Sequence, residues 1–209
     1  MSTTNRRSVM MLYSDKMDPV GHAVRIVLAE KDINVEIQYI DAGDPPVELR
    51  ELNPYTDTDT LTLADRDLVL YDIQVIMEYL DERFPHPPLM PVDPVARATC
   101  RQLCFRVRRD IYVPLAQLQG GNEIALANAR KTIRDNLTAI AGAFDQKPYF
   151  MSDEYSLVDC CLAPVLWRLP YLGIKLPAAA KPLQKYAERL FARPGFRKSL
   201  SDAERELQP

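Results

Sequence analysis

The stretch Phe84-Pro85-His86-Pro87-Pro88-Leu89-Met90-Pro91 decides how this chain is organised, and with Pro94 it places five prolines within ten residues. Each proline lacks an N–H and fixes its own φ, so neither a helix nor a central strand can run through the segment. Each also favours extended geometry in the residue before it. The stretch therefore predicts a stiff, extended connector.

The two sides of this connector differ in pattern. Short β-branched runs alternate with helical stretches before it, whereas helical patterns dominate after it. We therefore predict an α/β N-terminal domain of thioredoxin-like layout over residues 1–84, a proline-rich linker over 85–94 and an all-α C-terminal domain over 95–209. A chain of this length can bury the core that such an arrangement needs.

The N-terminal part predicts the element order βαβ, α, ββα. The alternation of apolar and polar residues over 35–40 is typical of a half-buried strand, and strand, helix and strand in close succession form a βαβ unit with a right-handed crossover. Asp72 is a good N-cap for the last helix. The expected strands are Ser8–Tyr13, Val35–Ile40, Thr60–Leu63 and Leu68–Leu70, and the expected helices are Val20–Lys31, Pro45–Leu52 and Ile73–Arg83.

The C-terminal part predicts only helices. Pro114 and Pro164 each fall inside one of them, where a proline should kink, bend or end the helix. Ser156 and Asp159 have the spacing of a capping box before an apolar helix. The expected helices are Val95–Gln119, Glu123–Phe144, Leu157–Leu169, Ala178–Ala192 and Pro194–Leu207.

The composition argues against several classes of function. The net charge of −3 argues against a broad nucleic-acid-binding surface, without excluding a local basic patch. No apolar run approaches the ~18 residues of a membrane span, and the N-terminal residues lack a signal-peptide pattern, so we expect a cytoplasmic protein. Four cysteines without a CxxC pair and only two histidines make a metal site improbable, and no cofactor is expected.

Several motifs resemble known proteins. The segment Ser156-Leu157-Val158-Asp159 resembles the helical-domain folding motif of the glutathione transferase superfamily. A longer segment, residues 76–92 followed by Pro94-Val95-Ala96-Arg97, resembles the stringent starvation protein A family, as does Leu166-Trp167-Arg168-Leu169-Pro170. That bacterial family has the transferase fold but regulates transcription while bound to RNA polymerase, and it is not known for transferase chemistry.

The resemblance implies a non-catalytic regulator of the starvation or stress response. Its expected partners are RNA polymerase and the primary sigma factor, without direct sequence-specific contact to nucleic acid and without a membrane. A homodimer is expected, because the fold usually pairs the N-terminal domain of one copy with the helical domain of the other. A heterodimer with a related chain is the alternative.

The rival function is a glutathione-dependent transferase or peroxidase. Such an enzyme stabilises a thiolate with a side chain at the end of the first strand, near the first helix N-terminus. Ser14 and Tyr13 are the possible donors here. Asp18 is closest to the expected position, where a carboxylate would repel a thiolate, so we interpret it as a helix N-cap.

Two further parts of a glutathione site differ from the superfamily pattern. Leu61 falls in the slot of the cis-proline, and since a cis bond before leucine would cost ~3 kcal/mol, we predict a trans bond and a remodelled loop. Asp72-Ile73 replaces the usual Glu-Ser pair, which removes a hydroxyl donor. We therefore predict no catalytic residue and a vestigial glutathione site at Ser14, Asp18, Leu61, Asp72 and Ile73.

The proline stretch itself is the candidate functional surface, because proline-rich segments lose little conformational entropy on docking. We predict that Pro85, His86 and Pro87 are exposed and bind a protein partner. The alternative is that the stretch only joins the domains, with its apolar members in the core. Further partner contacts are expected at Tyr79, Glu82 and Arg83, although Tyr79 also suits a partly buried position.

A second candidate surface is the face formed by Arg97, Arg101 and Arg108, with Arg106 and Arg109 nearby. It could contact an acidic protein or a nucleic acid. The alternative is a solvated face whose arginines pair with local carboxylates or lie at a dimer edge, which is the commoner outcome.

Overall fold

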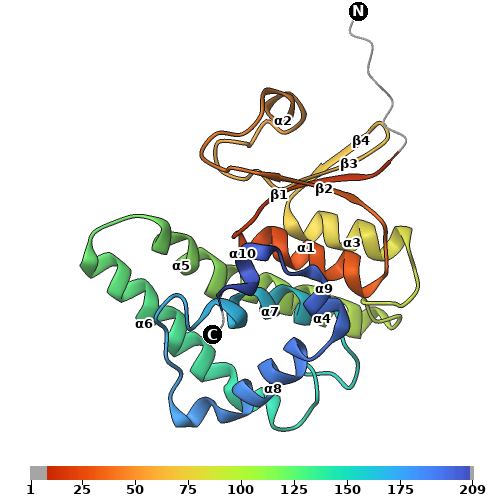
Figure 1. The fold of residues 1–209 in the computed structure, drawn as a ribbon. Helices are drawn as coiled ribbons and strands as arrows, with labels where there is room; N and C mark the ends of the chain where they lie inside the picture. Colours follow the sequence, from red (N-terminus) through yellow and green to blue (C-terminus); the bar gives the residue numbers. More distant parts are fainter. Residues whose placement is uncertain (1–8, 208–209) are drawn as a thin grey trace, which may run out of the picture.

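The computed structural model describes residues 9–207 and consists of a small sheet domain above a larger helical domain (Figure 1). The sheet has the order β2-β1-β3-β4, in which β2 is parallel to β1 while β3 and β4 are antiparallel to their neighbours. The strands are β1 (Met11–Asp15), β2 (Glu36–Ile40), β3 (Thr62–Asp65) and β4 (Leu68–Tyr71). The thioredoxin-like α/β prediction is confirmed.

Three helices accompany this sheet. Helices α1 (Pro19–Glu30) and α3 (Ile73–Arg83) pack beneath it, whereas α2 (Val47–Leu52) lies above it (Figure 1). The predicted N-cap role of Asp18 is confirmed, because its carboxylate accepts from the backbone N–H of Val20 and Gly21 at 3.1 and 2.9 Å. Such caps satisfy donors that the first helical turn leaves without partners.

The first strand is displaced from its predicted position. It runs from Met11 to Asp15, whereas we expected 8–13, of which residue 8 lies outside the described residues. Pairing sets the observed limits, since each of the five β1 residues has a partner in β2. Apolarity alone could not locate these ends. The shift matters because it places Ser14 inside the strand and not in the turn that follows.

The C-terminal domain is entirely helical, as predicted. Figure 1 shows its helices packed below α1 and α3. The α-helices are α4 (Pro94–Val107), α5 (Val113–Ala116), α6 (Glu123–Ile140), α7 (Leu157–Arg168), α8 (Lys181–Phe191), α9 (Pro194–Ser199) and α10 (Asp202–Arg205). Short 3₁₀ segments occur at residues 117–119, 141–144 and 178–180.

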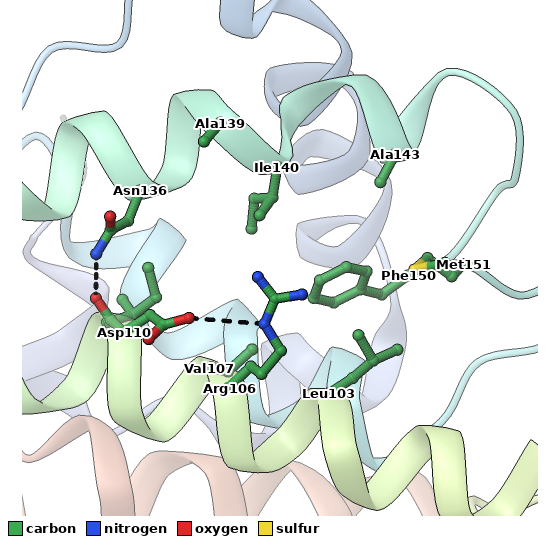
Figure 2. A pocket seen from close by; sticks show the side chains of 11 residues that line it. Leu103, Arg106, Val107, Asp110, Asn136, Ala139, Ile140, Ala143, Phe150 and Met151 are labelled. Carbon is green, nitrogen blue, oxygen red and sulfur yellow. Dashed lines mark hydrogen bonds and ion pairs between the residues drawn. The ribbon is translucent and has the colours of Figure 1, made fainter.

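Pro114 changes the helix in which it lies. The backbone turns from α-helical to π-helical over Arg108–Tyr112, immediately before α5. Because Pro114 has no N–H, the carbonyl of Asp110 loses its usual partner four residues on. Figure 2 shows the replacement: the side-chain amide of Asn136, on α6, donates to that carbonyl at 2.7 Å. The proline thereby explains a specific contact between two helices.

The predicted last helix, 194–207, is wrong as a single element. It divides into α9 and α10, separated by Leu200 and Ser201 in extended conformation. Ser201 begins a second capping box, in which its backbone N–H donates to Glu204 at 2.8 Å and its hydroxyl accepts from the Glu204 N–H at 3.1 Å. These local hydrogen bonds begin a new helix at Ser201, so α9 ends before it although the sequence pattern is helical throughout.

The break positions Glu204 between the two domains. Its carboxylate accepts two hydrogen bonds from Arg25 of α1, both at 2.8 Å, and another from Arg168 of α7. All three side chains are buried. A buried carboxylate held by two guanidinium groups thus joins the sheet domain to the helical domain, and removing it would leave two buried cations without a counter-ion.

The capping box at the start of α7 is confirmed. The Ser156 N–H donates to Asp159 Oδ2 at 2.8 Å, while Oδ1 accepts from the Phe150 N–H and the Tyr186 hydroxyl at 3.0 and 2.6 Å. Burial raises the pKa of Asp159, and these hydrogen bonds oppose that effect. The helix continues through Pro164 to Arg168.

Candidate functional site

The proline stretch forms an exposed ridge, which we define as residues 85–88. All four side chains are exposed, whereas Leu89 and Met90 are buried at 3% and 6% exposure and Phe84 packs partly against the core. The apolar members therefore lie in the core and His86 is exposed, as predicted, while binding of a partner stays a prediction. The ridge is positioned by the end of α3 before it and by α4 after it.

A buried ion pair holds the ridge from beneath. The Lys31 ammonium group lies 2.7 Å from Asp81 Oδ1 and donates to the carbonyls of Phe84 and Pro87 at 2.6 and 2.7 Å. The Asp81 carboxylate in turn accepts from the N–H groups of Leu89 and Met90 at 2.8 and 3.1 Å. One cation and one anion thus satisfy four main-chain groups of a segment that forms no regular structure.

Leu89, which directly follows the ridge, contacts the helical domain. The Leu89 carbonyl accepts from the N–H of Leu157, the first residue of α7, at 2.9 Å. The same residue donates its own N–H to Asp81 of α3. The ridge is therefore fixed on both domains, and its exposed surface needs little further ordering to receive a partner.

Sequence reasoning missed Lys31 and Asp81. One signal was available, because Asp81 follows Met77 by four residues and so lies on the apolar face of α3. A carboxylate at such a position needs a partner. The sequence did not indicate that the partner is fifty positions earlier in the chain.

The three additional ridge candidates behave differently from one another. Glu82 and Arg83 are exposed. Tyr79 is partly buried and packs against the core, and its hydroxyl donates to Asp65 at 2.6 Å. Arg83 also approaches Asp65, with its Nε at 3.8 Å. Of the three, only Glu82 and Arg83 are exposed.

The candidate hydroxyl donors of a thiol site are enclosed. Ser14 and Tyr13 are both fully buried. Adjacent strand residues point to opposite faces: Tyr13 packs with Ile40 and Leu49 beneath α2, whereas Ser14 faces α1 and donates to the Asp15 carbonyl at 3.1 Å. A Cβ placed on Gly21 would lie 2.2 Å from the Ser14 hydroxyl oxygen. Neither hydroxyl is open to a ligand thiol.

The region of the predicted glutathione site contains three carboxylates. Asp18 caps α1, Asp72 caps α3, and Asp59 lies in the loop between α2 and β3. The pKa of Asp59 is raised mainly by burial and further by the charge of Asp72, and that of Asp18 is raised mainly by burial. Arg108 balances part of this charge through a 2.5 Å ion pair with Asp72. An anionic thiol peptide would be disfavoured here.

The loop before β3 uses its own main-chain groups. The Leu61 N–H donates to Asp59 at 3.0 Å, and the Thr60 carbonyl accepts from the Thr62 hydroxyl at 3.2 Å. The only cis peptide bond among residues 9–207 joins His86 and Pro87, so the bond before Leu61 is trans, as predicted. The Leu61 N–H and the Thr60 carbonyl are therefore both bonded within the loop.

Asn53 organises this loop and was not identified from the sequence. Its buried amide donates to the Asp59 carbonyl and the Thr62 hydroxyl at 2.9 and 3.0 Å and accepts from the Tyr55 N–H at 2.8 Å. Ile73, the remaining residue of the predicted vestigial site, is buried in the core at 4% exposure. It presents no polar group to a ligand.

Most arginines on this face of α4 have partners within the protein. Arg101 contacts Glu78 at 2.7 Å and Arg108 contacts Asp72 at 2.5 Å, so both link α4 and its extension to the sheet domain. Arg97 donates to the Pro91 carbonyl at 3.0 Å. Arg106 pairs with Asp110 beside an apolar hollow of about 220 Å³ between α4 and α6 (Figure 2). Local partners thus account for most of this face.

Comparison with known proteins agrees with this arrangement. Residues 19–83 match the family Glutathione S-transferase, N-terminal domain, and residues 102–194 match Glutathione S-transferase, C-terminal domain. The stringent starvation protein A homolog of Coxiella burnetii is 48% identical over 97% of both chains. That of Pasteurella multocida is 50% identical over 95% of this chain and 93% of its own.

The chain belongs to the stringent starvation protein A family.

Its fold is shared with enzymes as well. The crystal structure of a glutathione transferase from Methylococcus capsulatus covers 95% of this chain and 100% of its own with a TM-score of 0.84, at 26% identity. This chain therefore combines a transferase scaffold with a predicted glutathione site in which Ser14 is buried and Asp18, Asp59 and Asp72 supply carboxylates. No helix within residues 9–207 is both long and apolar enough to cross a membrane, and these residues include no cluster of metal-ligating side chains.

Proposed function

We propose that this chain is a non-catalytic transcription regulator of the starvation or stress response that binds RNA polymerase and its primary sigma factor through the ridge. The observation that carries the proposal is the buried Lys31–Asp81 pair, which holds four main-chain groups and leaves Pro85, His86 and Pro87 exposed. Such a preorganised segment gives up little entropy when a protein docks on it. Glu82 and Arg83 extend the same surface.

The proposal is tested with purified polymerase holoenzyme containing the primary sigma factor. We expect a tagged copy of this protein to retain the holoenzyme and to alter transcription from sigma-dependent promoters in vitro. His86→Ala should lose both effects. Tyr171→Ala is the matched control, because its ring is 63% exposed on the helical domain, away from the ridge. Unchanged binding and regulation by His86→Ala would refute the role of the ridge.

The absence of transferase or peroxidase activity is part of the same proposal. It is supported by the enclosed Ser14, by the carboxylates around it and by the internal bonding of Thr60 and Leu61. Retention on immobilised glutathione together with measurable conjugation would contradict it. A Ser14→Ala variant then separates an active hydroxyl from contaminating activity.

We also propose that the molecule acts as a homodimer in the cytoplasm. Exposed apolar side chains lie around Arg108 on β4, α3, α4 and α5, at Leu68, Val75, Phe105 and Val113. Burial of such a patch is a common basis for association. Sedimentation of the isolated protein tests this: a dimer mass is expected, whereas a monomer that pairs only with a related chain would favour the heterodimer.

A further inference from the structure

The charge of the chain is unevenly distributed. Residues 175–198 contain seven of the 26 basic side chains and only one of the 29 acidic ones, so this segment carries +6 while the remainder carries −9. Such segregation within an acidic protein creates a local positive field that the net charge conceals. The segment includes α8 and most of α9.

Helix α8 directs its cations to solvent. Its buried side chains are Leu183, Tyr186 and Leu190, which occupy one face. On the other side, Lys181, Lys185 and Arg189 follow one another at intervals of four residues and are all exposed. Residues at this spacing lie on one side of a helix, about 6 Å apart along its axis. The helix therefore presents a row of cations.

Arg197 of α9 lies at the C-terminal end of α8. Its Nε donates to the carbonyl of Phe191, the last residue of α8, at 3.2 Å. We call Lys181, Lys185, Arg189 and Arg197 the α8 basic face. Glu188 is the one acidic side chain on α8 and is also exposed. Figure 1 shows α8 on the side of the helical domain away from the sheet.

The cations of this face are not neutralised by the protein. Within residues 9–207, none of the four forms an ion pair with a carboxylate; Arg189 and Arg197 contact only backbone carbonyls, those of Pro148 and Phe191. Their neighbours differ, because Arg193 pairs with Glu30 and Lys198 pairs with Asp32, both at 2.6 Å. The α8 basic face therefore retains its charge for an external partner.

The face also lacks the anchors of a protein interface. Protein contacts depend on buried aromatic or aliphatic side chains, and no large apolar side chain of α8 or α9 is exposed. Exposed examples occur elsewhere, among them Phe105 and Val75. A polyanion backbone needs only cations, because its contacts are electrostatic and independent of sequence.

We propose that the α8 basic face binds the phosphate backbone of duplex DNA without reading its sequence. The inference does not depend on the ridge or on polymerase, since it rests on charges of a different surface. It is tested with the purified full-length chain and a fluorescent duplex of arbitrary sequence, by anisotropy at several salt concentrations. Four phosphate contacts predict a slope of log K against log salt of about −3 to −4, so affinity should fall roughly a hundredfold between 50 and 200 mM salt.

Matched variants locate the contact. The triple variant Lys181→Gln, Lys185→Gln, Arg197→Gln should reduce the slope to about −1, because each removed phosphate contact reduces it by about one. The control triple Lys16→Gln, Arg66→Gln, Lys131→Gln removes the same charge from exposed positions outside this face and should leave the slope nearly unchanged. Glu188→Gln should tighten binding two- to threefold, a gain that a folding defect cannot produce.

Three results would overturn the proposal. The first is a salt slope near zero for the unmodified chain. The second is an equal loss in the two triple variants, which would indicate a general charge effect. The third is displacement of the duplex by polyglutamate of equal charge concentration as readily as by unlabelled duplex, which would assign the face to acidic protein segments.

Discussion

The two ends of helix α1 use buried polar groups in opposite ways. At the N-terminal end, the Asp18 carboxylate caps the helix and the Ser14 hydroxyl packs against Gly21. Both polar groups therefore contact only the protein itself. At the C-terminal end, about 18 Å away along the helix axis, Lys31 holds the carbonyls of a segment whose side chains face solvent. The difference teaches that one helix can bury the polar groups at one end and use a buried cation at the other end to hold an exposed segment in place.

Removing the anion beneath the ridge should have the largest effect. Asp81→Ala leaves the buried Lys31 without its counter-ion and two N–H groups without acceptors, so we expect a loss of about 3–5 kcal/mol in the free energy of unfolding. Urea denaturation measures it. Glu82→Ala, at the adjacent exposed position, is the control and should cost at most about 0.5 kcal/mol. Equal losses in the two variants would mean that the ion pair does not hold the ridge.

Filling the closed end should have the next largest effect. In Gly21→Ala the new Cβ would lie 2.2 Å from the Ser14 hydroxyl oxygen, and such overpacking costs about 1–3 kcal/mol. The double variant Ser14→Ala, Gly21→Ala should recover much of this loss, because the clashing oxygen is gone. Urea denaturation of the single and double variants gives the coupling free energy between positions 14 and 21. Additive effects would show that the hydroxyl is not packed against the helix.

The two histidines extend the comparison to pH. His22 is buried in α1, where Nδ1 accepts from Arg168 at 3.0 Å and Nε2 donates to Ser199 at 3.0 Å. Burial and the charges of Arg168 and Arg25 hold its pKa well below the usual value. Below pH ~6.5 His22 binds a proton in the unfolded chain but not in the folded chain. The free energy of unfolding should therefore fall as pH decreases, by at most about 1.4 kcal/mol per pH unit.

Thermal denaturation between pH 7.5 and 5 tests this dependence. His22→Gln keeps polar contacts without the titrating ring, so its stability should decline less over that interval. His86→Ala should retain the full decline, because the exposed ring lies outside the buried network. If the loss of stability at low pH disappeared in His86→Ala but persisted in His22→Gln, the pH dependence would belong to His86 and not to His22.

The smallest effect on folding is expected at the ridge surface. His86→Ala should change the free energy of unfolding by no more than about 0.5 kcal/mol, because exposed substitutions away from caps and buried networks are nearly neutral. Denaturation of the same protein sample used for polymerase binding measures it. A loss above 2 kcal/mol would mean that failure to bind reflects unfolding and not a missing contact.

Local signals were sufficient for much of this fold. Asp18 and the Ser156–Asp159 box could be predicted because a cap acts on backbone groups within three residues. The alternation of patterns on either side of the proline stretch gave the two domain types, because helical and strand periodicities differ. The exposure of His86 and the burial of Leu89 and Met90 followed from the same stretch.

The remainder depends on contacts between distant residues. The limits of β1 are set by pairing with β2, and the division of the last helix accompanies the placement of Glu204 against Arg25 and Arg168. The closure of the thiol region likewise depends on the contact of Ser14 with Gly21 and on the amide of Asn53. No periodicity of the sequence predicts these contacts, because each joins residues from different elements.

Leu89 has one further consequence. Its N–H belongs to the sheet domain through Asp81, and its carbonyl belongs to the helical domain through Leu157. Rocking of one domain against the other would break one of these two bonds, so a single residue ties the two domains together. Under the proposed role of the ridge, a macromolecule bound there would be held in a fixed orientation relative to the helical domain, because the two domains are joined at Leu89.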